Sequence, residues 1–112
     1  MGKYSIGEFE EVVLLTVAIL YQNAYGISIK EEIENRLQRK VSVGAMRTAL
    51  NRLEKKGLLV SEFGEATKVR GGKRKRFFKV TPYGKTCLEK VMETRKQMWD
   101  SIPSIAFDFK FA

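Results

Sequence analysis

The chain has 112 residues, a formal net charge of +8 and 44% hydrophobic residues, a composition typical of one soluble globular domain. It has no histidine, which excludes Ser-His and Cys-His nucleophile pairs, and its single cysteine makes neither an internal disulfide nor a zinc site. The longest apolar run, residues 12–21 with Thr16 interrupting it, is about half of the roughly 20 residues that span a membrane. We therefore expect a cytoplasmic protein that is not an enzyme and uses no metal, cofactor or membrane.

Two amphipathic helices are predicted before residue 38. Ser5 followed by Glu8 is a capping-box pattern, and the apolar positions after it predict a helix of about four turns that is central to the core. Ser28 and Glu31 form a second possible capping box, with a start one turn earlier as the alternative. From residue 29 to residue 37, isoleucine or leucine recurs at every fourth position, which predicts one apolar stripe with charged residues outside it.

A third helix is predicted from Ser42, a suitable N-cap, to Gly57, where the chain must turn left-handed. Positions 46, 49, 50 and 53 are apolar and follow the spacing of a core-facing stripe. The opposite face has donors that reach base edges and phosphates, and it has no carboxylate. Taken alone, the pattern fits a DNA-recognition helix and a solvated amphipathic helix equally well. The polar face consists of Arg47, Thr48, Asn51, Arg52 and Lys55.

A β-hairpin with a basic tip is predicted next. Residues 60–63 and 77–80 are short strand-like runs, and the adjacent Gly71 and Gly72 allow a tight turn between them. A solvated basic loop is the alternative interpretation. The position of the basic run, directly after a candidate recognition helix, favours contact with DNA phosphates. The five cations within seven residues around the turn are Arg70, Lys73, Arg74, Lys75 and Arg76.

A last helix is predicted after the hairpin, with Thr81 as N-cap and Pro82 at its first position. Its apolar stripe runs to residue 102. In the tail that follows, Phe107, Phe109 and Phe111 alternate with charged residues. Docking of these rings on the same domain or a second subunit is one interpretation, closure of a ligand pocket is another, and disorder is the third.

Three helices followed by a basic hairpin form a winged helix-turn-helix arrangement, so the predicted fold class is mainly α with a small β-hairpin. Residues 36–79 have a net charge of +11 and the remainder has −3, a segregation typical of a surface that binds a polyanion. We predict binding to double-stranded DNA, with the third helix in the major groove and the hairpin on adjacent phosphates or in the minor groove. The predicted contacts are Ser42, Arg47, Thr48, Asn51, Arg52 and Lys55, with Arg70, Lys73, Arg74, Lys75 and Arg76.

The chain resembles the PadR-like winged-helix transcriptional regulators, in particular their compact branch. The resemblance covers about residues 6–90 and is most specific in the motif RGGKRKRFFKVTPYGK, where Val80 stands in place of the family's usual leucine. The stretches GEFEEVVLLTVAIL, AYGISI and VSVGAMRTALNRLEKKGLL support it. Arg47 stands where the family's recognition helix often has a tyrosine, so no known operator is carried over to this chain.

The resemblance implies a homodimeric repressor whose two recognition helices enter successive major grooves of a pseudo-palindromic operator. Together with the apolar stripe and the phenylalanine pattern, it divides the chain into a winged-helix DNA-binding domain at residues 1–81, a dimerisation helix at 82–102 and an aromatic tail at 103–112. Some compact members bind flat aromatic compounds between subunits, which implies a small aromatic or apolar effector near Trp99 and Phe107. A dimer-core tryptophan without a ligand is the alternative. The implied interface residues are Leu88, Val91, Met92, Met98, Trp99 and Ile102.

Two other functions fit the same basic face. One is an architectural or RNA-binding protein that binds nucleic acid without reading its sequence. The other is a winged helix that serves as a protein-interaction module, and the +11 charge of residues 36–79 argues against it.

Overall fold

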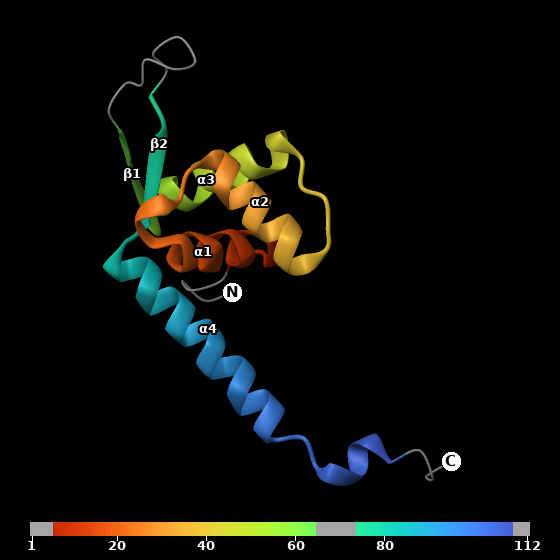
Figure 1. Cartoon of the computed structure of the whole chain (residues 1–112). Helices are drawn as coiled ribbons and strands as arrows, with labels where there is room; N and C mark the ends of the chain where they lie inside the picture. Colours follow the sequence, from red (N-terminus) through yellow and green to blue (C-terminus); the bar gives the residue numbers. More distant parts are fainter. Residues whose placement is uncertain (1–5, 65–73, 109–112) are drawn as a thin grey trace.

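The computed structural model of the protein describes residues 6–64 and 74–108 (Figure 1). This part is mostly helical with one two-stranded antiparallel hairpin, so the predicted fold class is confirmed. None of its helices combines the length and the apolar character that crossing a bilayer requires. The elements are α1 (Glu8–Leu20), α2 (Gly26–Leu37), α3 (Val43–Lys55), β1 (Leu59–Phe63), β2 (Arg76–Val80) and α4 (Pro82–Asp100), with 3₁₀ turns at Tyr21–Asn23 and Ser104–Phe107.

The first helix begins later than the capping pattern predicts. The prediction of Ser5 as N-cap, a residue that lies outside the described ranges, is wrong because Gly7 precedes the first residue of α1. The side chain of Glu10, instead of Glu8, accepts a hydrogen bond from the Gly7 N–H at 3.4 Å. A carboxylate three residues into a helix can reach back to the otherwise unpaired N–H of the N-cap, and Glu8 is too close to the helix start to do so.

The second helix begins one turn before Ser28, so the alternative start is confirmed. Tyr25 is the N-cap, and its N–H donates to Ser28 Oγ at 3.0 Å. Ile29 and Ile33 are buried as predicted, but Leu37 is 45% exposed and the prediction of a core position for it is wrong. Leu37 is the last residue of α2, and Gln38 turns left-handed with φ 52°. The chain thus leaves the core before the third position of the stripe can be covered.

The hydrophobic core holds α3 with its polar face outward. Val13, Leu14 and Val17 of α1 are almost inaccessible, and α1 packs against both α2 and α3. Full burial of each large aliphatic side chain stabilises the fold by about 1.5–3 kcal/mol relative to exposure. That free energy fixes the rotation of α3 about its axis. The α3 residues buried in this core are those predicted, Met46, Ala49, Leu50 and Leu53.

The β1–β2 hairpin, called the wing below, is anchored to the core at its base. Its register pairs Leu59 with Val80 and Phe63 with Arg76, so each strand is one residue longer than predicted. The N–H of Phe78 donates to the carbonyl of Ala24 at 2.8 Å, which ties β2 to the segment before α2. The turn predicted at residues 70–73 lies outside the described residues.

Helix α4 starts on the domain and then projects away from it (Figure 1). Thr81 caps it, since Thr81 Oγ1 accepts from the Gly84 N–H at 2.9 Å and donates to the Gly57 carbonyl at 2.7 Å. A Cβ atom on Gly84 would overlap the Leu58 carbonyl oxygen, so only glycine permits this close junction. The helix ends at Asp100, two residues before the predicted end. The resulting molecule measures 65 × 29 × 21 Å.

Candidate nucleic-acid interface

The outer face of α3 is exposed along its whole length. All five polar side chains predicted to face outward, from Arg47 to Lys55, are exposed. Among the described residues, Arg47, Thr48, Asn51 and Lys55 have no side-chain hydrogen bond or ion pair. These donors are therefore available to an external acceptor without the loss of an internal contact. Gly57 follows the helix with φ 80°, which confirms the predicted left-handed end.

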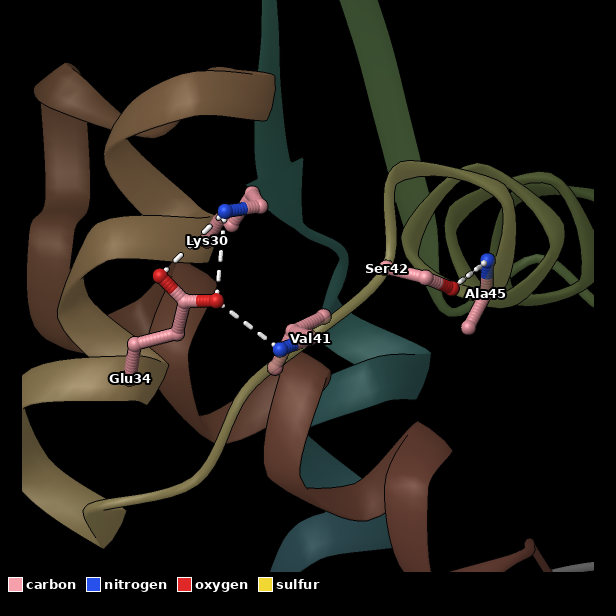
Figure 2. Close-up of polar contacts among 5 residues, drawn as sticks. All are labelled: Lys30, Glu34, Val41, Ser42 and Ala45. Carbon is pink, nitrogen blue, oxygen red and sulfur yellow. Dashed lines mark hydrogen bonds and ion pairs between the residues drawn. The ribbon is translucent and has the colours of Figure 1, made fainter.

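The link that leads into α3 is held by two contacts where it meets the helix (Figure 2). The Glu34 carboxylate accepts from the Val41 N–H at 2.8 Å and forms an ion pair with Lys30 Nζ at 3.1 Å. The Val41 hydrogen bond, followed by the Lys30 hydrogen bond, lowers the pKa of Glu34 below its ordinary value. Ser42 Oγ accepts from the Ala45 N–H at 3.0 Å, which confirms the predicted N-cap. The exposed Ser42 hydroxyl donates to no acceptor among the described residues, and a helix N-terminus attracts a phosphate.

Two concave surfaces divide the outer face of α3 between them. Arg47 and Asn51 line a groove of about 480 Å³ between α2, α3 and β2. Thr48 and Arg52 line a shallower cleft between the start of α1 and α3. The groove joins α3 to the wing, so a ligand that lies in it contacts both elements. Its other lining residues are Tyr25, Gly26, Ile27, Lys30, Val43, Met46, Leu50, Lys75, Arg76 and Phe78.

The described wing cations have different local partners. Arg74 Nε donates to the Gly64 carbonyl at 2.8 Å. None of the described carboxylates forms an ion pair with the Arg74 guanidinium. Lys75 Nζ lies 4.2 Å from the centroid of the Tyr25 ring, a cation–π contact that holds it at the groove. Arg76 instead forms an ion pair with Glu54 of α3 at 2.6 Å. Arg70 and Lys73, also predicted to contact DNA, lie outside the described residues.

Glu10 holds the other edge of α3. Its carboxylate is largely buried, accepts from Lys56 Nζ at 2.8 Å, and has Arg52 Nη1 at 4.0 Å. Burial by itself raises the pKa of Glu10. The hydrogen bonds from Lys56 and Gly7, together with the charges of Lys56 and Arg52, outweigh burial and lower this pKa below the ordinary 4.5. The ionised carboxylate therefore stabilises the contact between the start of α1 and the end of α3.

The lowered pKa of Glu10 predicts an acid-dependent loss of stability. Because the pKa is lower in the folded chain than in the unfolded chain, the stabilisation is complete above the unfolded value and is lost as the pH falls through the folded value. We expect the melting temperature of the wild type to fall more between about pH 6 and pH 3 than that of Glu10→Gln. Glu93→Gln, which removes an exposed carboxylate from α4, serves as the control and should melt like the wild type. Parallel pH profiles for the wild type and Glu10→Gln would contradict this role.

The interface residues predicted on α4 and directly after it fall into two groups. Leu88 and Val91 are half-buried against the core of their own domain. The others, Met92, Met98, Trp99 and Ile102, are exposed, and Met98 and Trp99 are 69% and 68% exposed. The division falls between Val91 and Met92. Beyond the ion pair between Arg95 and Glu11, at 2.8 Å, α4 extends past α1 and all of its residues are exposed.

The predicted ligand-binding rings of Trp99 and Phe107 lie side by side. Their centroids are 6.3 Å apart, and both side chains are mostly exposed. Phe109 and Phe111 lie outside the described residues. Sequence reasoning missed Ile105, a further apolar side chain in the 3₁₀ turn that is 68% exposed. It also missed Val43, exposed at the groove, although its place directly after the N-cap was a usable signal.

Comparison with known proteins agrees with this arrangement. The sequence model of the transcriptional regulator PadR-like family matches residues 14–90, more than half of the chain. A PadR-like transcription factor from Bacteroides fragilis has a similar structure, with 24% identity, a TM-score of 0.69 and coverage of 82% of this chain and 84% of that chain. A PadR family regulator from Clostridium difficile has 26% identity, a TM-score of 0.60 and coverage of 80% and 91%.

A third similar structure is a PadR family transcriptional regulator from Eggerthella lenta, with 23% identity, a TM-score of 0.65 and coverage of 83% of this chain and 80% of that chain. A search of curated proteins found no match. The relatives below 25% identity support the fold, and the family match supports the assignment. With its three-helix core, its basic wing and its exposed α3 donors, the chain belongs to the PadR-like family of DNA-binding transcriptional regulators.

Proposed function

We propose that the protein is a homodimeric, sequence-specific repressor that binds a pseudo-palindromic site in double-stranded DNA. The observation that carries the proposal is the groove that α3 donors and wing cations line together. Arg47 and Asn51 read base edges in this proposal, while Ser42, Lys55 and the wing cations without a described carboxylate partner, Arg74 and Lys75, bind phosphates. An activity on DNA is consistent with the cytoplasmic location predicted from the sequence.

Competition between a genomic duplex and a scrambled duplex tests the proposal. Specific binding should favour the genomic site by roughly 10³ or more at moderate salt. A dimer that engages about 8 phosphates should give a slope of about −7 in a plot of log affinity against log salt concentration. A slope near zero would contradict DNA binding altogether. Equal affinity for both duplexes with a steep slope would favour the architectural protein instead.

The proposed dimer forms through α4 and the 3₁₀ turn after it. Met98, Trp99 and Ile105 are exposed apolar side chains on a part of the chain that projects from its own domain. A second copy would remove that surface from water, which is the usual reason for such a patch. Two-fold symmetry would separate the half-sites by roughly 10 bp or a multiple of it, since both recognition helices must meet the same side of the duplex.

We also propose that a small aromatic or apolar effector binds beside Trp99 and Phe107. The two exposed rings form a tilted pair at 6.3 Å, which offers a surface for a flat compound. Trp99 is the single tryptophan, so its fluorescence reports binding directly. We expect saturable quenching by such a compound, and a several-fold weaker affinity in Phe107→Ala than in Phe63→Ala, the control on the wing. Absence of quenching across a broad panel of aromatic compounds would contradict the effector.

A further inference from the structure

Three polar side chains join α3 to both strands of the wing. Glu54 Oε1 accepts from Arg76 Nη2 at 2.6 Å, and Glu54 Oε2 accepts from Ser61 Oγ at 2.6 Å. Arg76 Nε in turn donates to Ser61 Oγ at 2.8 Å. The three contacts form a closed triangle, called the Glu54 triangle below. Both carboxylate oxygens are used, so α3, β1 and β2 are held together by charge-assisted hydrogen bonds.

The triangle lies on one face of the wing. Ser61 pairs with Phe78 in the hairpin register, and Arg76 pairs with Phe63, so these four side chains project on the same side. The Arg76 guanidinium lies 5.4 Å from the Phe78 ring centroid and 5.9 Å from that of Phe63. Rings and carboxylate together restrict its position. An isolated two-stranded hairpin is only marginally stable, and this clamp connects α3 to the middle of β1 and the far end of β2, so it restricts the angle of the wing to α3.

The triangle also changes the charge that the wing presents. Glu54 is the single acidic residue of α3, and its partner is one of the wing cations predicted to contact DNA. Arg76 lines the groove and its side chain is 43% exposed, so its guanidinium is accessible to a phosphate in the groove. A carboxylate at 2.6 Å cancels most of the attraction between this guanidinium and a phosphate.

We propose that Glu54 is a positioning and specificity residue that holds the wing at a fixed angle and keeps Arg76 from binding phosphates. This role rests on the proposed DNA-binding function. Because Arg76 does not bind a phosphate, the affinity for any DNA is lower. The fixed wing angle preserves affinity for the site that α3 and the wing contact together. The combination favours specific over non-specific binding, because a phosphate contact adds equally to both.

Salt titrations of DNA binding by the intact chain test the role. In Glu54→Gln, which keeps the size of the side chain, Arg76 becomes free to bind a phosphate. We expect the salt slope to steepen by about 0.9 per subunit and binding to scrambled DNA to strengthen several-fold. The ratio of genomic to scrambled affinity should fall several-fold. In Glu54→Gln combined with Arg76→Gln, the slope should return to the wild-type value.

Glu62→Gln is the matched control, because Glu62 is an exposed carboxylate on the opposite face of the wing, paired in register with Phe77. It removes the same charge without releasing an arginine and should keep the wild-type slope. Ser61→Ala loosens the triangle without altering any charge, so it should lower the genomic-to-scrambled ratio at an unchanged slope. Circular dichroism verifies that each variant remains folded.

Two results would overturn the role of Glu54 while leaving DNA binding itself intact. One is a wild-type slope in Glu54→Gln. The other is a double-variant slope about 0.9 per subunit shallower than the wild type, which would mean that Arg76 already binds a phosphate in the wild type. Failure of the proposed function is different, because the wild type itself would then show a slope near zero.

Discussion

Met98→Glu should convert the protein to a monomer and weaken its binding to the genomic site by about 10²–10⁴, the usual range of avidity between two linked sites. Met98 is 69% exposed on the projecting half of α4, on the same stripe as Trp99 and Ile102. In the proposed dimer a glutamate there would bury an unpaired charge in each subunit, which is strongly destabilising. Sedimentation analysis and DNA titration measure the two effects, and the salt slope should fall to about half of its wild-type value as one subunit's phosphate contacts remain.

Gln97→Glu is the control for this substitution. Gln97 is the preceding residue on the same exposed helix, so the variant adds the same charge on the opposite side of the apolar stripe. It should remain dimeric and bind the genomic site like the wild type. A dimeric Met98→Glu variant with normal affinity would show that the subunits meet through another surface.

Arg47→Ala should cost about 1–3 kcal/mol of binding free energy on the genomic site and relax the preference for one base pair. Arg47 is exposed in the groove beside the wing, and its guanidinium has no partner among the described residues. A planar guanidinium matches the O6 and N7 acceptors of guanine, so its loss should affect one base position. Titration against genomic duplexes with each base pair replaced in turn measures the change.

Lys55→Ala provides the comparison for Arg47→Ala. Lys55 is an exposed cation in the last turn of the same helix, and a flexible ammonium group suits a phosphate better than a base edge. Its removal should weaken binding to genomic and scrambled DNA alike and make the salt slope shallower by about 0.9 per subunit. An equal loss on both duplexes in Arg47→Ala would assign that side chain to a phosphate instead.

Local chemistry made much of the fold predictable. Ser42 and Thr81 cap α3 and α4 as predicted. In each cap the hydroxyl accepts a hydrogen bond from the N–H three residues later, so the contact depends only on nearby sequence. The two faces of α3 were equally predictable, since a residue's place on a helix depends only on its position in the sequence. The error at the start of α1 arose because two overlapping patterns, Ser5 with Glu8 and Gly7 with Glu10, compete within six residues.

The contacts between elements could not be predicted in the same way. Nothing local shows that Leu37 is left exposed, or that Leu88 packs on its own domain while Met98 does not. Those outcomes depend on where α2 ends and how far α4 extends beyond α1. The Glu54 triangle is another example, because its partner Arg76 is 22 residues away across the hairpin.

The amino-acid sequence by itself determined the winged-helix order, the polar face of α3 and the concentration of positive charge in residues 36–79. Periodicity, capping and charge are properties of neighbouring residues, so they can be predicted without knowledge of the fold. Tertiary structure alone decided which wing cations are free, which α4 residues stay exposed and how Arg47 comes to share a groove with Lys75. Each of these depends on distances between segments far apart in the chain, which are set when the common core is buried.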